Sequence, residues 1–163
     1  MFSKIFFIAT LACFGLLGGG YFIEYVYHIE PCPLCILQRL VFGIIAILFL
    51  VGALHNPKGI ATYIYSILIM LMSITGSLLA ARQIWLQHLP PDQVPSCTAG
   101  LNRLLEVYPV LEALKLIFNS SGECSVIDFT ILGLSLAEWS LFSFVLLIGF
   151  SITLIFLIKK RRI

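Results

Sequence analysis

The amino-acid sequence predicts an all-α membrane protein built as a bundle of four transmembrane helices. Of its 163 residues, 60% are hydrophobic and only 11% are charged, which is more apolar than the core of a soluble domain requires. Four apolar stretches are each long enough to cross about 30 Å of hydrocarbon at about 1.5 Å per helical residue. The sequence lacks the alternating pattern of a closed β-barrel, so helices must satisfy the backbone polar groups within the bilayer. We expect one integral membrane domain over residues 1–163 and no separate soluble domain.

The first predicted crossing could instead be a secretory signal. Lys4 precedes it, and the Ala-Cys pair at residues 12–13 resembles a lipoprotein cleavage site. The apolar run continues through the glycines at 18–20 to Ile23, which is longer than the roughly 7–15 residues of a signal core. We therefore expect a retained helix, in which the three glycines allow close helix packing. The predicted helices cover about residues 5–23, 36–54, 60–80 and 141–158, with outer loops at about 24–35 and 81–140.

Basic residues predict the orientation, because Lys and Arg in short loops resist translocation. Six of them lie on the side of the two termini and of the short inner loop at residues 55–59, against four on the opposite side. All eight acidic residues fall in the outer loops or near their helix ends. Both termini are therefore predicted to be cytoplasmic. The six inner residues are Lys4, Lys58, Lys159, Lys160, Arg161 and Arg162, and the four outer ones are Arg39, Arg82, Arg103 and Lys115.

Four of the five cysteines form two pairs on the outer side. Cys32 and Cys35 form a CxxC motif, while Cys97 and Cys124 bracket a polar insert in the second outer loop. Disulfides persist on that side of a membrane, where the compartment is oxidising. Cys13 lies within the first predicted helix, where we interpret it as a small buried hydrophobic residue. The two outer pairs indicate dithiol–disulfide chemistry at a bilayer surface.

The residue pattern alone leaves two other roles possible for these thiols, a metal site and a structural disulfide. Four thiolates can hold a structural zinc ion, as in a membrane metal-binding or trafficking protein. The wide separation of Cys97 from Cys124 and the lack of a histidine beside either pair make a metal the less favoured interpretation. A bond between Cys97 and Cys124 could also be purely structural, since closing such a loop is worth roughly 3–4 kcal/mol. It would then stiffen the docking loop of an adaptor.

Arg39 is the charged residue that needs an explanation. Cys35 opens the second helix, where backbone N–H groups and the helix dipole favour a thiolate. Arg39 follows four residues later, on the same face and about one turn deeper. An arginine there must find a partner or extend to the interface. We interpret Arg39 as holding Cys35 as an anion and donating hydrogen bonds to a polar headgroup. Gln38 is either a further donor or a simple interfacial glutamine.

The second outer loop has two parts with different predicted structures. Pro90, Pro91 and Pro95 exclude a regular helix and predict an extended, accessible segment before Cys97. Apolar residues between 101 and 118 recur at helical spacing with polar residues interleaved. They predict a short amphipathic helix on the bilayer surface, which would hold the loop near the interface.

The stretch Pro31-Cys32-Pro33-Leu34-Cys35-Ile36-Leu37-Gln38-Arg39 resembles the quinone-site motif of the DsbB family of disulfide-bond formation proteins. Segments 81–87 and 132–140 and the pair Cys97 and Cys124 are similar to family segments in the same order. The resemblance spans essentially the whole chain.

The resemblance implies a multi-pass enzyme of the bacterial inner membrane, a disulfide:quinone oxidoreductase with its redox cysteines in the periplasm. Its partner would be a periplasmic thioredoxin-like protein of the DsbA type, whose thiolate would attack Cys97, with Cys124 as the loop mate of Cys97. Cys32 would exchange with that pair, and Cys35 would act on the quinone beside Arg39. Gln87 would approach the quinone headgroup. The sequence does not choose between ubiquinone and menaquinone, and neither a resident metal nor a nucleic-acid partner is expected.

Overall fold

The structure is a computed structural model. It describes residues 2–29, 31–57, 59–90, 92–94, 109, 112, 115, 122–127 and 129–160. Cys97 lies outside the described residues, as does nearly all of the segment predicted to form an amphipathic helix.

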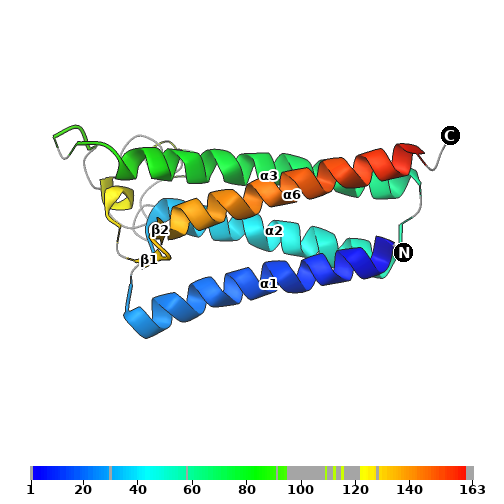
Figure 1. The fold of residues 1–163 in the computed structure, drawn as a ribbon, viewed down its shortest axis with the longest axis horizontal. Helices are drawn as coiled ribbons and strands as arrows, with labels where there is room; N and C mark the ends of the chain where they lie inside the picture. Colours follow the sequence, from blue (N-terminus) through cyan, green and yellow to red (C-terminus); the bar gives the residue numbers. More distant parts are fainter. Residues whose placement is uncertain are drawn as a thin grey trace.

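In the part of the chain that the structure describes, four long helices make up the bundle, which confirms the predicted all-α membrane fold. Each is long and apolar enough to span a membrane. Both termini lie at one end of the bundle, and the short elements of the second outer loop lie at the other (Figure 1). The helices are α1 (Phe2–Tyr27), α2 (Pro33–His55), α3 (Ile60–Gln87) and α6 (Leu136–Lys160).

Every helix is longer than the apolar stretch that predicted it. The largest extensions lie at the end of the bundle away from the termini, where α3 continues to Gln87 and α6 begins at Leu136. Polar residues such as glutamine and arginine are good helix formers, so a change from apolar to polar residues does not end a helix. These extensions carry polar side chains beyond the apolar stretches.

The start of α6 is fixed by a reciprocal pair of hydrogen bonds. The Ser135 backbone N–H donates to Glu138 Oε2 at 2.6 Å, and the Glu138 N–H donates to Ser135 Oγ at 3.3 Å. This capping box satisfies two N–H groups that have no partner within the helix. Just before it, β1 (Thr130–Ile131) and β2 (Leu134–Ser135) form a small antiparallel hairpin.

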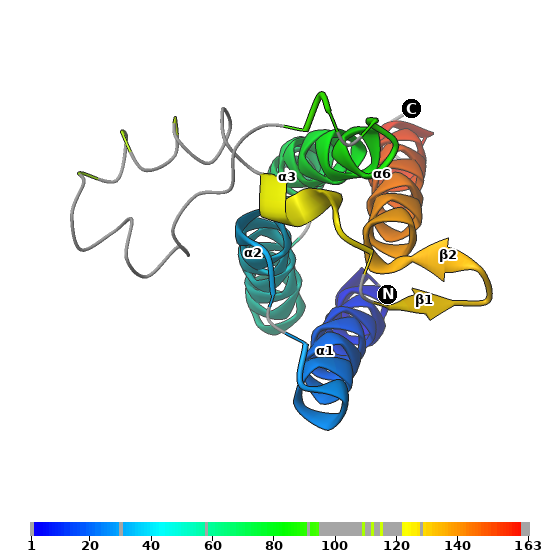
Figure 2. The same ribbon diagram turned by 90° about the vertical axis from the view of Figure 1, so that its left-hand side faces the viewer.

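The helices pack in chain order, with α1 on α2, α2 on α3 and α3 on α6. Viewed along the bundle, α2 and α6 lie on opposite sides between α1 and α3 (Figure 2). The buried face of α3 is unusually small and polar, which lets neighbouring backbones approach closely. Most of its residues recur at spacings of three and four: Thr62, Ser66, Ile69, Ser73, Gly76, Ala80 and Gln83, with Leu79 and Leu86 also buried.

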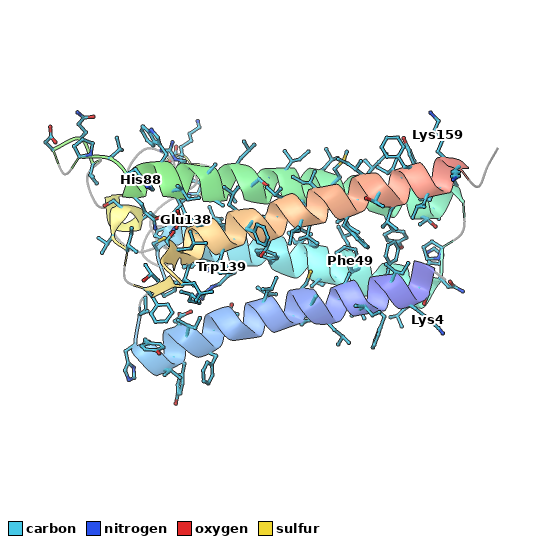
Figure 3. All side chains as sticks on the ribbon, in the orientation of Figure 1. Lys4, Phe49, His88, Glu138, Trp139 and Lys159 are labelled. Atoms are coloured by element: carbon cyan, nitrogen blue, oxygen red, sulfur yellow. The ribbon has the colours of Figure 1, made fainter. Side chains whose placement is uncertain are left out.

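The serine hydroxyl groups on this face are satisfied within their own helix, and Thr62 donates to the Pro57 carbonyl oxygen just before the helix, at 2.8 Å. Ser66 and Ser73 donate to the carbonyl oxygens four residues earlier, at 2.9 and 2.8 Å. Such bonds remove the cost of an unpaired polar group in hydrocarbon. Charged and amphipathic side chains lie at the two ends, with Lys4 and Lys159 at one end and His88, Glu138 and Trp139 at the other (Figure 3).

Candidate redox site

The Cys32–Cys35 pair lies at the N-terminus of α2, at the end of the bundle away from the chain termini. Cys32 is the N-cap residue and Pro33 occupies the first helical turn, where its missing N–H is no loss and its fixed φ suits a helix start. This start turns both thiols to one side. Cys32 Sγ and Cys35 Sγ lie 3.1 Å apart, within hydrogen-bond distance, so the pair is a hydrogen-bonded dithiol. Both residues are half-buried.

Gln83 of α3 contacts both sulfurs. Its Nε2 lies 3.1 Å from Cys35 Sγ and 3.5 Å from Cys32 Sγ. Its Oε1 accepts a 2.7 Å hydrogen bond from Gln38 Nε2. Sequence reasoning missed Gln83 and assigned Gln38 to a headgroup. The available signal was the helical spacing that places Gln83 on the same face as Ser73, Gly76 and Ala80.

Cys124 lies beside Cys32. It belongs to the short helix η1 (Gly122–Ser125), which packs on α3 and α2, and only 1% of its surface is exposed. The structure brings together Cys32, Cys35 and Cys124, three of the four cysteines expected to act together.

The contact between Cys32 and Cys124 changes the chemistry of Cys32. A hydrogen bond with the Cys124 side chain is the largest cause of a raised Cys32 pKa, which reaches about 12. Burial adds to this rise, while the hydrogen bond with Cys35 opposes it. Because the thiolate is the nucleophile, reduced Cys32 is predicted to be unreactive at neutral pH while it contacts Cys124.

Replacing Cys124 with alanine should therefore make reduced Cys32 react faster with an alkylating reagent. Each unit by which the Cys32 pKa falls increases the thiolate fraction about tenfold below that pKa, so we expect at least a roughly tenfold rise in rate at pH 8. The rate in the unsubstituted protein should continue to rise as the pH approaches the Cys32 pKa. Mass spectrometry of the Cys32 peptide after quenched labelling measures both effects. Cys124→Ser retains a hydrogen-bonding side chain and should accelerate labelling less; equal acceleration by the two variants would contradict the explanation.

Arg39 is paired within the bundle. Its Nη1 donates to Glu24 Oε2 of α1, and its guanidinium carbon lies 4.8 Å from the centre of the Tyr21 ring. The Arg39 side chain is 18% exposed. An arginine that only extended to the interface would need neither contact, so the structure supports a partnered Arg39. Sequence reasoning counted Glu24 only among the outer acidic residues and missed this role.

Two cavities meet at Cys35 and Arg39. The smaller one, of about 50 Å³, is also lined by Cys32, Gln83 and Gln87. Gln87 Oε1 accepts a 3.1 Å hydrogen bond from Ser135 Oγ, which fixes this amide beside the start of α6.

The larger cavity, of about 390 Å³, lies between α1, α2 and α6. Its lining is mostly apolar, with Cys35, Gln38 and Arg39 among its polar groups. This volume is within the range of small-molecule sites.

The glycines of α1 leave this larger cavity open. Gly15, Gly19 and Gly20 line it. A Cβ atom built on Gly18 or Gly19 would meet no atom of the described residues within 4 Å. The expectation that these glycines allow close helix packing is therefore wrong for Gly18 and Gly19, whereas a Cβ on Gly20 would lie 3.9 Å from Arg39 Nε of α2. Close packing of α1 occurs nearer its N-terminus, where Phe6 lies against Gly52 of α2.

The fold and the site together define a multi-pass membrane protein that carries a cysteine centre at one end of a four-helix bundle. The chain belongs to the DsbB family, since the family model described as "Disulfide bond formation protein DsbB" matches residues 3–154. Proteins named disulfide bond formation protein B are similar along most of their length. The relative from Hahella chejuensis is 44% identical over 141 residues, covering 86% of both chains. The relative from Azoarcus sp. is 45% identical over 139 residues, covering 85% of this chain and 83% of its own.

A third relative, disulfide bond formation protein B 1 of Pseudomonas aeruginosa, is 39% identical over 149 residues, or 91% of both chains. Family membership and these relatives support an oxidoreductase-type role in disulfide bond formation.

Proposed function

We propose that this protein reoxidises a periplasmic thioredoxin-like dithiol protein of the DsbA type and passes the electrons to a membrane quinone. The observation that carries this proposal is the position of Cys35. Its sulfur belongs to a thiol pair in contact with Cys124, and the residue also lines a largely apolar cavity beside Arg39. Cys35 therefore connects thiol exchange with a site for an apolar acceptor. The protein resides in the bacterial inner membrane, with both termini cytoplasmic and the cysteine end periplasmic.

The relay consists of two thiol–disulfide exchanges and one oxidation. A thiolate of the partner attacks Cys97 of a Cys97–Cys124 disulfide and forms a mixed disulfide with Cys97. The partner's second thiol then attacks this mixed disulfide, so that the partner leaves oxidised and Cys97 and Cys124 remain as a dithiol. The resulting dithiol then reduces a Cys32–Cys35 disulfide through a mixed disulfide of Cys32, for which the contact between Cys32 and Cys124 provides the path. Finally, the Cys32–Cys35 dithiol loses two electrons and two protons as its disulfide re-forms.

The two cavities support an acceptor with a polar head and an apolar body. Quinone, when bound, supplies a carbonyl headgroup that takes up two electrons and two protons. Arg39 and Gln38 are the proposed donors to that headgroup at the larger cavity, and Gln87 lies at the smaller one. The glycines of α1 leave room for the apolar body. Ubiquinone and menaquinone both have this form.

The first test follows quinone absorbance after the purified protein is mixed with a reduced DsbA-type protein. We expect stoichiometric quinone reduction, and we expect it to disappear in Cys35→Ser because the pair can no longer form a disulfide. Cys13→Ser is the matched control, since Cys13 is buried in α1 away from the pair. Absence of quinone reduction with several partners and both quinone types would refute the proposal. Retention of zinc by the reduced protein would then favour a metal-binding protein.

A further inference from the structure

Gln83 contacts both sulfurs of the Cys32–Cys35 pair but has no part in the relay described above. It is 4% exposed and lies on the buried face of α3, 48 residues from Cys35 in sequence. A buried amide must find partners for its oxygen and its nitrogen. Gln83 Oε1 accepts hydrogen bonds from Gln38 Nε2 at 2.7 Å and from the Cys35 thiol at 3.5 Å, while its Nε2 donates to the two sulfurs. Both ends of the amide therefore face the redox pair.

Gln38 fixes the orientation of the Gln83 amide. The 2.7 Å hydrogen bond from Gln38 Nε2 to Gln83 Oε1 leaves Gln83 Nε2 directed at Cys35 Sγ, 3.1 Å away, with Oε1 3.5 Å from the same sulfur. Gln38 is itself 3% exposed and precedes Arg39 on α2. The Gln38 amide is thus linked to the redox pair through the Gln83 side chain of α3.

We propose that Gln83 is a positioning residue that stabilises the reduced state of the Cys32–Cys35 pair, and that Gln38 holds Gln83 in the required orientation. The proposal builds on the proposed function. Its physical basis is that the reduced pair offers Gln83 a thiol S–H donor, whereas a disulfide has no S–H to donate. The hydrogen bond from Cys35 Sγ to Gln83 Oε1, 3.5 Å long, therefore exists only when the disulfide has taken up two electrons and two protons. This difference makes the Cys32–Cys35 disulfide easier for the dithiol of the outer loop to reduce.

The test measures the reduction equilibrium of the Cys32–Cys35 pair against glutathione, in full-length protein with Cys13, Cys97 and Cys124 replaced by serine. In this background we expect Gln83→Met to lower the equilibrium constant for reduction about tenfold, or roughly 30 mV for a two-electron couple. Gln38→Met should shift it in the same direction by a smaller factor. The double variant should match Gln83→Met, because Gln38 acts through Gln83 and the two effects do not add.

Ser73→Ala is the matched control. Ser73 is a buried polar residue on the same face of α3, and its hydroxyl bonds only within its own helix; its loss should leave the equilibrium unchanged. An unchanged equilibrium in Gln83→Met, or a double variant equal to the product of the two single effects, would overturn the proposal. If Gln83→Met does not yield folded protein, an unchanged reduction equilibrium in Gln38→Met would overturn the proposal instead. Because glutathione replaces both partner and quinone, failure of the proposed function leaves this measurement valid.

Discussion

Arg39→Met should raise the KM for quinone by about 10- to 100-fold, because a hydrogen bond to a charged group contributes about 1.5–3 kcal/mol. The guanidinium lies at the larger cavity beside Cys35, which is where the headgroup is proposed to bind. Arg39→Lys keeps the charge but loses the planar pair of donors, so its KM should be intermediate. Steady-state quinone reduction at saturating concentrations of the reduced partner measures both values.

The salt bridge with Glu24 offers a way to separate binding from structure. If Arg39 served only to neutralise Glu24, then Glu24→Gln would be harmless and would rescue Arg39→Met in the double variant. If Arg39 binds the headgroup, Glu24→Gln should raise the KM much less than Arg39→Met does, and the double variant should stay as defective as Arg39→Met. Full rescue by Glu24→Gln would rule out the headgroup role.

The sequence predicted the number and order of the helices because bilayer thickness sets a length requirement that hydropathy can test directly. It did not predict where they end. The α6 start depends on the capping box between Ser135 and Glu138, a local signal that lies outside the apolar stretch. The extension of α3 to Gln87 has no hydropathy signal, because polar residues continue a helix without difficulty.

The candidate site shows the same division between local and tertiary information. Cys32, Cys35 and Arg39 were expected near one another from helical spacing alone, and all three line the smaller cavity. Gln83 and Glu24 were missed because each comes from another helix. Their approach depends on how α1 and α3 are rotated about their axes. Hydropathy fixes which stretches are helical, but nearly uniform apolar helices give little indication of which face turns inward.

The rotation of α3 depends on close contact at Gly76. A Cβ atom built at this position would lie 2.3 Å from the ring of Phe144 on α6. Phe144 is fully buried, and its ring stacks on Phe42 of α2 with centroids 4.1 Å apart, so the ring cannot move aside freely. Gly76 thereby allows three helices to meet. It also lies two helical turns before Gln83 on the same face of α3, so a side chain at residue 76 should disturb the amide contact with the thiols.

Gly76→Leu should destabilise the protein by about 3 kcal/mol or more, at the upper end of the cost of overpacking a core. For a chain of this size, such a loss lowers the Tm by on the order of 10 °C. Thermal unfolding in detergent measures the shift.

Gly149→Leu is the matched control, because a Cβ at Gly149 meets no atom of the described residues within 4 Å and leucine is a better helix former than glycine. Adding Phe144→Ala to Gly76→Leu should recover part of the loss, because it opens space for the leucine. If Gly76→Leu were as stable as Gly149→Leu, the contact between Gly76 and Phe144 would not determine how α3 and α6 pack.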